Sequence, residues 1–232
     1  MKSIKLISDA HGAYPYDLYV EGDFDICIDA GDFSPTWSHE EHYQRAAFRD
    51  EYLQFISGLP CKHFVFIAGN HDFLCERPWF YRLVAEYDEK RQDDWPELHY
   101  LQDSFVVIDG KKIWGSPWSP KFGSWAFMDD DESLGYRYNK IPDDVDIIVS
   151  HGPPNMAYGD YKLDMVNEFG YGVHKGSDAL RRTIISIQPE FVVCGHIHEG
   201  YGVGKINDTV VYNASLRDEF YQVANPPIRL EL

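Results

Sequence analysis

Residues 63–72 read HFVFIAGNHD, an apolar run that stops at a turn of glycine, amide, imidazole and carboxylate side chains. Four other apolar runs stop in the same way, and their turns are 9–12 (DAHG), 31–32 (GD), 151–152 (HG) and 195–198 (GHIH). Glycine beside Asp, Asn or His is a turn signal, so each run is predicted to be a β-strand followed by a loop. The repeated combination indicates one site built from five strand ends.

Helical periodicity between these strands indicates how they are arranged. Apolar residues within 48–59 recur on one face of a helix that Pro60 ends. Another helix, with Ser177 as a suitable N-cap, is marked by Leu180, Ile184 and Ile187. Strands that alternate with helices predict a largely parallel sheet, whose ligands bind beyond the carboxyl ends of the strands. We therefore expect eight polar side chains at one edge: Asp9, His11, Asp32, Asn70, His71, His151, His196 and His198.

Other segments carry only local signals. Asp109-Gly110 between the apolar runs 105–108 and 112–114 predicts a β-hairpin, and the alternating segments 209–212 and 228–232 predict two more strands. Residues 115–131 are expected to form a long surface loop, and the acidic run 129–132 is expected to be solvated. Because no linker rich in Ser, Gly or Pro divides the chain, we expect a single domain over residues 1–232.

The types of side chain at the predicted edge narrow the ligand. Carboxylate, amide oxygen and imidazole without thiolate suit divalent Mn, Fe, Zn or Co with open coordination positions rather than a closed structural zinc site. These donors are too many for one ion but suit two if one carboxylate bridges, and Asp32 is the natural bridge because it stands in the middle of the set. A pair of divalent ions is a common device for phosphoester cleavage.

Composition limits the partners. The chain has 38 acidic and 21 basic residues, a formal net charge of −17, and 44% hydrophobic residues. A folded core is expected, and duplex nucleic acid is a disfavoured partner because no basic face is evident. No apolar run approaches the roughly 18–20 residues of a membrane span, and residues 1–9 turn polar too early for a signal peptide. The acidic surface favours a small phosphoester over a long polyanion.

The polar turns also resemble a known family. In order along the chain, Asp9-x-His11, Gly31-Asp32, Gly69–Asp72, His151-Gly152 and Gly195-His196-x-His198 are similar to the five motif blocks of the calcineurin-like metallophosphoesterases. Further stretches resemble a branch of this family, the metallophosphoesterase-domain-containing proteins of animal brain and their microbial and viral relatives. These stretches are Gly31–Ser34, Gly115–Trp118, His151–Pro154, Gly195–Gly202, Asn213–Ser215 and Asn225–Pro227.

The resemblance implies a fold and a set of roles. The fold would be a four-layer α/β/β/α sandwich, two mixed sheets flanked by helices, with the metals at the strand ends. One ion would be held by Asp9, His11, Asp32 and His198, and the other by Asp32, Asn70, His151 and His196. His71 would protonate the leaving oxygen, and Asp72 would orient His71 and favour its charged form.

The same resemblance implies a substrate class. The branch implies activity on phosphodiesters of the cyclic-nucleotide type, with Mn as the usual activator. Candidate substrate contacts are Asn70, His71, Gly152 and Trp118. Two alternatives stay open: a phosphomonoesterase with the same core, and a non-catalytic scaffold. The scaffold is disfavoured because such proteins usually lose ligands and every ligand position is filled here.

The remaining distinctive residues allow less specific interpretations. The four cysteines form no CxxC pair and are read as buried reduced thiols, which suits a cytoplasmic protein: Cys27, Cys61, Cys75 and Cys194. The histidines outside the blocks are read as surface or structural residues: His39, His42, His63, His99 and His174. The aromatic residues of the middle loop either stack on a base or pack the loop onto the sheet: Trp118, Phe122, Trp125 and Phe127.

Overall fold

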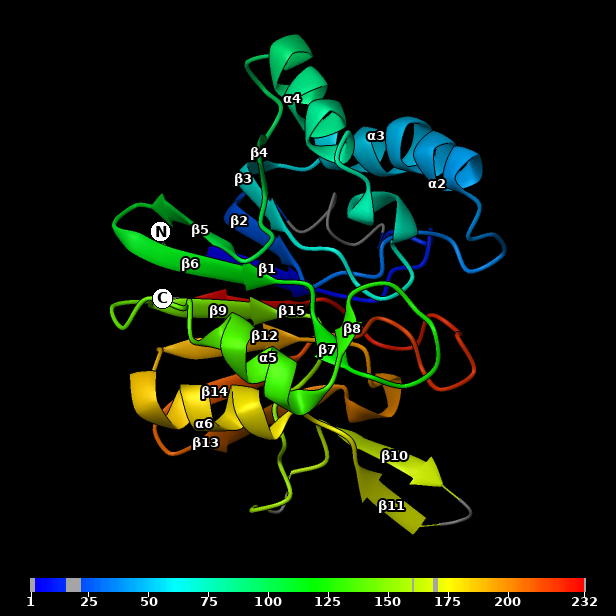
Figure 1. Ribbon diagram of the computed structural model, residues 1–232. Coiled ribbons are helices and arrows are strands. Elements are labelled where there is room, and N and C mark those ends of the chain that lie inside the picture. The colour runs from blue at the N-terminus through cyan, green and yellow to red at the C-terminus, as the bar shows by residue number, and fades with distance from the viewer. Residues whose placement is uncertain (1–2, 16–21, 160, 169–170, 232) are drawn as a thin grey trace.

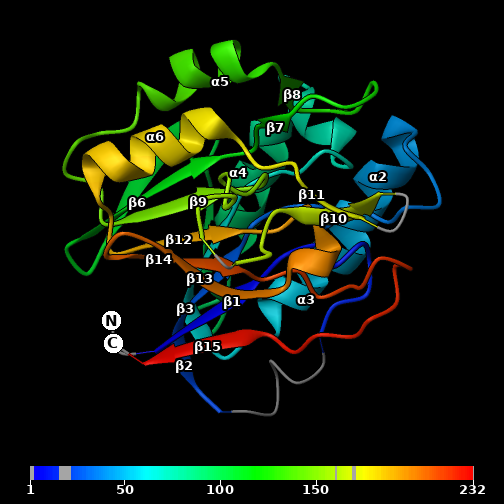
Figure 2. The same cartoon turned by 90° about the horizontal axis from the view of Figure 1, so that it is seen from below.

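The computed structural model describes residues 3–15, 22–159, 161–168 and 171–231. Two β-sheets lie face to face in the middle of the molecule, and helices cover the outer face of each sheet (Figure 1). The same four layers are visible from below in Figure 2. The expected α/β/β/α sandwich of two mixed sheets is therefore confirmed.

The first sheet has the strand order β15-β1-β2-β3-β4. Strands β1 to β4 are parallel, and β15 pairs with β1 in the antiparallel direction. The strands are β1 (Ser3–Ile7), β2 (Phe24–Asp29), β3 (Cys61–Phe66), β4 (Glu97–Tyr100) and β15 (Ile228–Glu231). On the outer side lie α2 (Glu41–Ala47), η1 (Phe48–Tyr52), α3 (Leu53–Ser57), η2 (Phe73–Glu76) and α4 (Phe80–Lys90).

The second sheet has the strand order β13-β14-β12-β9-β6-β5. Its four central strands are parallel, and both edge strands are antiparallel to their neighbours. The strands are β5 (Ser104–Ile108), β6 (Lys111–Ser116), β9 (Ile147–Ser150), β12 (Phe191–Cys194), β13 (Gly202–Ile206) and β14 (Thr209–Asn213). Helices α5 (Asp131–Tyr138) and α6 (Asp178–Ile187) cover its outer face.

Short elements complete the chain. They are β7 (Ser119–Pro120), β8 (Met128–Asp129), β10 (Met165–Glu168), β11 (Tyr171–His174) and η3 (His198–Gly200). Strands β7 and β8 pair with each other, and β10 and β11 form a hairpin beside η3 (Figure 1).

Alternation of side chains along each strand produces three apolar layers. Val65 and Ile67 face the other sheet, where Ile113 lies in the same cluster. Phe64 and Phe66, on the opposite face of β3, pack under the outer helices. A third cluster lies between the second sheet and helices α5 and α6. The two sheets are thus held rigidly against each other, and their strand ends are brought together.

Most of the predicted elements are present. All five predicted strands end at their glycine-containing turns. Asp109 and Gly110 both have positive φ, 50° and 81°, as a tight hairpin turn with right-handed twist requires. The Ser177 hydroxyl accepts the N–H of Leu180 at 3.1 Å and begins α6 as expected. Leu232, the end of the predicted final strand, lies outside the described residues.

Three regions described here differ from the expectation. The helix predicted over 48–59 begins earlier, at Glu41, and passes through a π-turn. Its first seven residues were not predicted because they bury only Gln44 and Ala47 and therefore have no apolar stripe. The acidic run is not simply solvated: Asp130 caps α5 by accepting the N–H of Ser133 at 2.9 Å. α4 was not predicted, although its buried residues recur with helical spacing.

The cysteines and the membrane expectation can also be checked. Each of the four cysteines is buried and forms no disulfide, in agreement with the interpretation as reduced thiols. Among the residues that the structure describes, no helix combines the length and the apolar character needed to cross a membrane.

Candidate metal centre

The polar side chains predicted at one edge converge at the carboxyl ends of strands from both sheets. Asp9 and His11 follow β1, Asp32 follows β2, and Asn70 and His71 follow β3. The second sheet supplies three histidines, of which one follows β9 and two follow β12: His151, His196 and His198. Almost all of these side chains are buried, so the site is enclosed by the loops that form it.

Asp32 lies between two groups of donors. Its Oδ2 is 3.4 Å from Nε2 of His151 and 3.8 Å from Nε2 of His11. Its Oδ1 accepts the backbone N–H of His71 at 2.7 Å. A single carboxylate in reach of both groups occupies the position that a bridging ligand needs.

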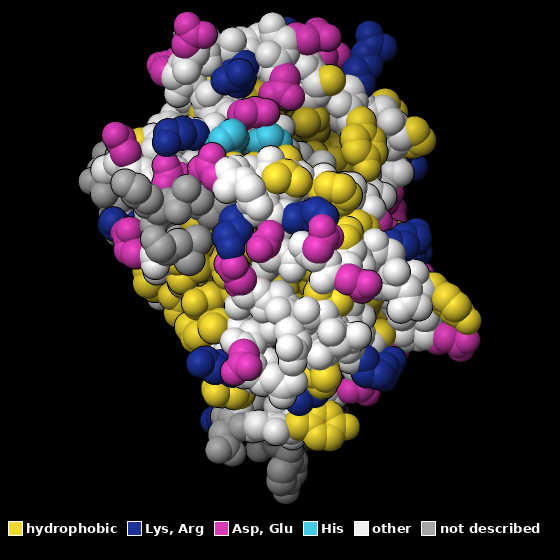
Figure 3. All heavy atoms as spheres, turned by 90° about the vertical axis from the view of Figure 1, so that its left-hand side faces the viewer, with side chains coloured by type: hydrophobic (Ala, Val, Ile, Leu, Met, Phe, Trp, Pro, Cys, Tyr) yellow, Lys and Arg dark blue, Asp and Glu magenta, His cyan; other side chains and the backbone are white. Residues whose placement is uncertain are grey.

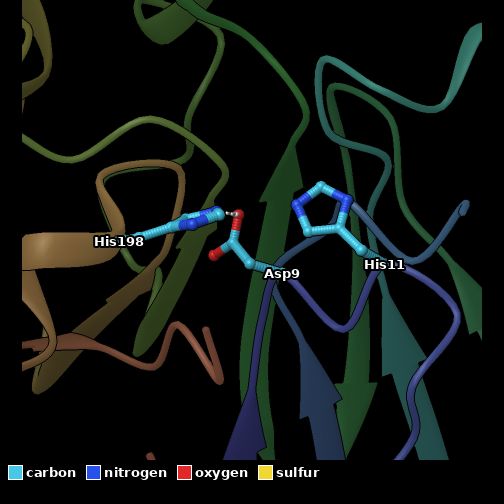
Figure 4. A group of neighbouring side chains, drawn as sticks. All are labelled: Asp9, His11 and His198. Carbon is cyan, nitrogen blue, oxygen red and sulfur yellow. Dashed lines mark ion pairs between the residues drawn. The ribbon is translucent and has the colours of Figure 1, made fainter. Parts of the chain in front are cut away.

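Asp9 anchors the first group. Its Oδ1 is 3.5 Å from Nε2 of His198, and Figure 4 shows its carboxylate between the imidazoles of His11 and His198. The backbone N–H of His196 donates to both Asp9 oxygens, at 3.1 and 3.0 Å. The loop after β12 is therefore tied directly to the loop after β1.

Asn70 anchors the second group. Its Oδ1 is 3.0 Å from Nε2 of His151 and 2.7 Å from Nδ1 of His196. The amide oxygen and two imidazole nitrogens thus point toward one another from the ends of three different strands. Together with Asp32 they form the second set of donors that the family resemblance implied.

Backbone carbonyls orient three of the histidines. Nδ1 of His151 is 2.9 Å from the Ala30 carbonyl, and Nδ1 of His198 is 2.9 Å from the Asp218 carbonyl. Nδ1 of His11 lies 3.4 Å from the Ser34 carbonyl. A proton on Nδ1 leaves the Nε2 lone pair directed into the site. Metal-binding histidines usually donate their other ring N–H to a carbonyl or carboxylate in this way.

The loops reach this arrangement through strained backbone. Asp9, His11, Asp32 and His196 all have positive φ, at 55°, 46°, 58° and 68°. Such conformations are uncommon for residues with a Cβ and persist only where the surrounding structure holds them, typically at functional sites. Four of the eight motif residues therefore have this backbone conformation, which six non-glycine residues outside the motifs share among the described residues.

Two glycines leave room for the carboxylates. A Cβ on Gly69 would overlap Oδ1 of Asp32, and a Cβ on Gly195 would overlap Oδ2 of Asp9. The glycine beside each motif is thus a steric requirement of the site.

The charges in the site favour ionised carboxylates. Burial alone would raise the pKa of Asp9, but its hydrogen bond to His198 and the charges of His198 and His151 lower it below the ordinary value. The pKa of Asp32 is likewise lowered, because His151 and His71 outweigh the effect of burial. Both carboxylates are therefore anionic and able to bind cations.

The imidazoles fall into two classes. Burial lowers the pKa of His11 to about 4 and that of His196 to about 3, so both are neutral at pH 7. Burial also opposes the charge of His151, but Asp32 and Asp9 raise its pKa to about 9. Neutral imidazole is the form that binds metal, so His11 and His196 are ready to bind, whereas a cation would replace the proton of His151.

The residues fit a pair of divalent cations. Nε2 of His11 is buried and has no hydrogen-bond partner among the described residues, although it points toward two carboxylates. A buried nitrogen without a partner is costly unless a cation completes its surroundings. Potential ligand atoms also lie within 4.8 Å of one another in three sets at this site: Asp9 with His11 and His198, Asp9 with Asp32 and His151, and His11 with Asp32 and His71.

His71 is held at the edge of the site by contacts that the sequence did not reveal. Nε2 of Gln44 donates to the His71 carbonyl at 2.6 Å, while Oε1 of Gln44 accepts the Leu74 N–H at 2.9 Å. Nδ1 of His71 lies 3.3 Å from Nε2 of His39. His39 is exposed, as expected for a surface residue, and it also contacts the predicted proton donor.

Asp72 has a different place from the one expected. Its carboxylate accepts backbone N–H groups of Asp32, Ser34 and Gly69, at 2.9, 2.9 and 2.7 Å, so it fixes two loops rather than the His71 ring. Burial and the charge of Asp32 raise the pKa of Asp72 to about 7. The pKa of His71 is lowered by burial, against the opposing charge of Asp32, which differs from the expectation that Asp72 favours the charged imidazole.

Trp118, an expected substrate contact, packs against other residues of the protein. Trp118 packs the middle loop: its ring lies under the Arg137 guanidinium at 3.3 Å, and its Nε1 donates to Asp103 at 3.0 Å. Trp125 and Phe122 from the same loop reach the site instead, with ring centroids 4.5 Å from His71 and 5.4 Å from His196. Trp118 thus packs the loop, and Trp125 and Phe122 bring aromatic rings of the same loop to the site.

Gly152 also has a packing role. A Cβ on this residue would come within 2.8 Å of Cβ of Ser119, so the glycine permits β7 to approach the His151 loop.

Arg217 is a further residue that no sequence signal indicated. Its Nη2 donates to the carbonyls of Ala10 and His11, at 2.8 and 3.2 Å, and its Nε donates to Ala10 at 3.1 Å. The guanidinium therefore holds the strained loop after β1. A contact between a side chain and backbone more than 200 positions away leaves no local pattern in the sequence.

Comparisons with known proteins agree with this geometry. A family model described as calcineurin-like phosphoesterase matches residues 2–200. The human and mouse metallophosphoesterase domain-containing protein 1 are each 34% identical over 223 residues, which cover 90% of this chain. The chain spans 64% of the length of these relatives. The crystal structure of TT1561 of Thermus thermophilus is similar in fold, with a TM-score of 0.62 at 16% identity over 91% of this chain and 88% of that one.

Proposed function

Because the chain belongs to the calcineurin-like phosphoesterase family, we propose that it is a metal-dependent phosphodiesterase that hydrolyses small phosphodiesters of the nucleotide or cyclic-nucleotide type. One ion would be held by Asp9, His11, Asp32 and His198, and the other by Asp32, Asn70, His151 and His196. We propose Mn because the branch of the family that the chain resembles implies it; the oxygen and imidazole donors also suit Fe, Zn and Co, which are the alternatives. When bound, two such ions supply Lewis acidity and a water acidified for attack on phosphorus.

The proposal that the substrate is small depends mainly on the size of a cavity beside the site. A cavity of about 370 Å³ opens beside His196 and His198 and is lined by Phe122, Tyr221 and Lys121. This volume is within the range of small-ligand sites and suits a mononucleotide. The aromatic rings provide faces on which a base can stack. Two lysines and two glutamates also line the cavity, so their charges balance and the phosphate would be held by the proposed cations: Lys121, Lys175, Glu199 and Glu219. The net charge of −17 opposes the approach of a long polyanion.

The aromatic ring of Tyr221 lies close to the proposed ligands. Its centroid is 4.8 Å from that of His198 and 5.2 Å from that of His11. Together with Phe122 on the His196 side, it would confine a substrate from two directions. We assign these two rings to orientation of the group attached to the phosphate.

His71 is the proposed general acid. Its Nδ1 contacts His39, so Nε2 is the nitrogen assigned to donate a proton to the leaving oxygen. Burial lowers its pKa, which makes the imidazolium a stronger acid. Gln44 and Asp72 contribute by positioning, because they hold the backbone of the loops that carry His71 and Asp32.

The proposal is tested by substrate preference. Metal-free protein is reconstituted with Mn, and hydrolysis of bis-p-nitrophenyl phosphate is compared with that of p-nitrophenyl phosphate. A higher kcat/KM for the diester is expected. A large preference for the monoester would instead establish the phosphomonoesterase alternative, and no turnover of any phosphoester by metal-loaded protein would favour a scaffold.

A matched pair of variants tests the cavity. Phe122→Ala removes an exposed ring beside His196, whereas Phe105→Ala removes an exposed ring on β5, away from the cavity. We expect Phe122→Ala to raise KM for cyclic nucleotides roughly tenfold, in line with about 1–3 kcal/mol for one stacked base. Phe105→Ala should leave KM unchanged, and equal effects of the two variants would remove the argument for a base-binding cavity.

The remaining expectations about surroundings stay proposals. We propose a reducing, cytoplasmic setting because all four cysteines are buried thiols. We also propose that neither duplex nucleic acid nor a membrane is a partner, because the acidic surface repels phosphate groups.

A further inference from the structure

A second cluster of histidine and carboxylate lies at the amino ends of the strands, away from the site described above. His63 lies near the start of β3, and Glu97 and His99 lie on the neighbouring β4. In the parallel register Glu97 is opposite His63, and His99 is opposite Val65. Side chains two positions apart on a strand share a face, so all three project from the same face of the sheet.

The three side chains bring their donor atoms together. Nδ1 of His63 is 3.2 Å from Nε2 of His99. The Glu97 oxygens lie 3.5 Å from Nδ1 of His63 and 3.9 Å from Nε2 of His99. Ligand atoms in a tetrahedral zinc site lie about 2.0–2.2 Å from the metal, which places them roughly 3.3–3.6 Å from one another. The cluster is therefore within a few tenths of an ångström of that spacing.

Burial and exposure also suit a metal site. The side chains of His99 and His63 are 14% and 24% exposed, whereas that of Glu97 is 51% exposed. Packing thus holds the imidazoles in place, while the carboxylate can adjust. Burial, and the proximity of His63, lower the pKa of His99 against the opposing charge of Glu97, so His99 is neutral at pH 7. Figure 3 shows that histidine side chains reach solvent on this face, next to acidic side chains.

We propose that His63, Glu97 and His99 bind one divalent transition-metal ion, with Zn²⁺ as the best match. Two histidines and one glutamate with an open side form a familiar zinc donor set. The ion would link β4, the edge strand of the first sheet, to β3. Because an edge strand has a neighbour on only one side, this link would stabilise the part of the sheet that pairing supports least.

The test is a count of bound zinc. Metal-free full-length chain is equilibrated with Zn²⁺ and dialysed, and the zinc content per chain is measured for the unmodified protein and for His63→Ala and Glu97→Gln. His63→Ala should bind one zinc equivalent fewer than the unmodified protein, whatever number the catalytic site holds. Glu97→Gln, which keeps the size of an exposed side chain, should weaken the affinity of this zinc at least tenfold and leave phosphoesterase activity unchanged.

The matched control is His42→Ala. His42 also lies beside a glutamate, with Nδ1 3.5 Å from Oε2 of Glu40, but both side chains are largely exposed and no second imidazole bonds to either of them among the described residues. This variant should retain the full zinc content. The proposal is overturned if His63→Ala and the unmodified protein bind the same amount of zinc. The two imidazoles would then be joined by a hydrogen bond and not by a metal ion. An equal loss in His42→Ala would also overturn it.

Discussion

The two histidine–carboxylate clusters occupy opposite ends of the same sheet and are built in different ways. The cluster around Asp32, proposed to be catalytic and called the catalytic cluster below, draws its donors from strand-end loops of both sheets, and four of its residues have positive φ. The cluster of His63, Glu97 and His99 uses neighbouring positions on two regular strands. The first is almost fully buried, and the second is partly open to solvent.

This difference shows what backbone strain contributes to a site. Regular strand pairing can bring three donors together, but it leaves them at the surface and on one side of an ion. Enclosing two ions requires loops from several strands, tight turns and glycines that allow close approach. We therefore expect changes in the catalytic cluster to affect activity and metal content together, and changes in the surface cluster to affect metal content alone.

The largest expected effect is that of Asp32→Ala, which removes the carboxylate shared by both donor groups. We expect phosphoesterase activity to fall by roughly 10³-fold or more, as the loss of several kcal/mol of metal-derived stabilisation implies. Metal content should fall at the same time, as atomic emission would show. Full Mn stoichiometry in this variant would refute the bridging role, and Glu97→Gln is the contrasting variant at the other cluster.

His71→Ala should retain the catalytic metals but lose rate. A general acid contributes about 10²–10⁴-fold, and it matters most when the leaving oxygen is a poor leaving group. We expect a loss of about 10²-fold for an alkoxide leaving group and a much smaller loss for p-nitrophenol, measured as kcat/KM. Equal losses for both leaving groups would count against proton donation by His71.

Gly69→Ala tests whether steric room defines the catalytic cluster. The added Cβ would displace the Asp32 carboxylate, so metal affinity should fall by about 10–100-fold, as for other changes that misplace metal ligands. The control is Gly135→Ala in α5, where the nearest atom to the new Cβ is 3.8 Å away. That change should stabilise the protein by about 0.5–1 kcal/mol without altering metal affinity. Unchanged affinity in Gly69→Ala would show that the loops relax freely.

Gln44→Leu has a smaller effect that separates positioning from chemistry. It removes partners of the buried His71 carbonyl and Leu74 N–H, at a cost of about 1–3 kcal/mol in the free energy of unfolding. Urea unfolding measures this cost. Activity should fall while metal content is retained, because Gln44 touches the His71 loop and not the proposed ligands. A stable but fully active variant would mean that the loop needs no such support.

Asp29 affects stability rather than activity, and it separates burial from metal binding. Asp29 is the last residue of β2 and is buried, as Asp9 and Asp32 are. Its carboxylate accepts hydrogen bonds from the Tyr52 hydroxyl at 2.8 Å and the Gly31 N–H at 3.0 Å. Burial raises its pKa well above the ordinary value of 3.8, whereas imidazoles lower the pKa of the other two carboxylates. Its protonated form is therefore the one that the fold favours.

The sign of the pH dependence follows from linkage. Above pH 3.8 the folded protein holds a proton on Asp29 that the unfolded chain releases, so this contribution to stability is fully present below that pH and decreases as pH rises. Asp29→Asn cannot titrate. The stability of the unmodified protein relative to the variant should therefore fall by up to about 1.4 kcal/mol per pH unit above about pH 4. A difference independent of pH would contradict the raised pKa.

The catalytic cluster could be predicted because each of its pieces is local in sequence. A strand that stops at Gly-Asn-His-Asp is recognisable without knowledge of the rest, and parallel strands bring such ends together. Asp72 was assigned the wrong contact because sequence proximity to His71 says nothing of which groups its carboxylate meets. Its partners, the N–H groups of Asp32 and Ser34, are set by the packing of two loops.

The surface cluster could not be predicted in the same way. His63 and His99 are separated by 36 positions, and their contact depends on the register of β3 against β4. β4 itself has only four residues and was not predicted. Gln44 and Arg217 were not predicted for a related reason, because each forms hydrogen bonds with backbone groups that no sequence pattern identifies.

The most direct test of the two-metal account is the anomalous scattering of a crystal grown from Mn-loaded protein. We predict two strong peaks about 3.5–4 Å apart at the carboxyl ends of the strands. One peak should be ligated by Asp9, His11 and His198 and the other by Asn70, His151 and His196, with the Asp32 carboxylate between them. A single peak, or two peaks that Asp32 does not join, would contradict the account.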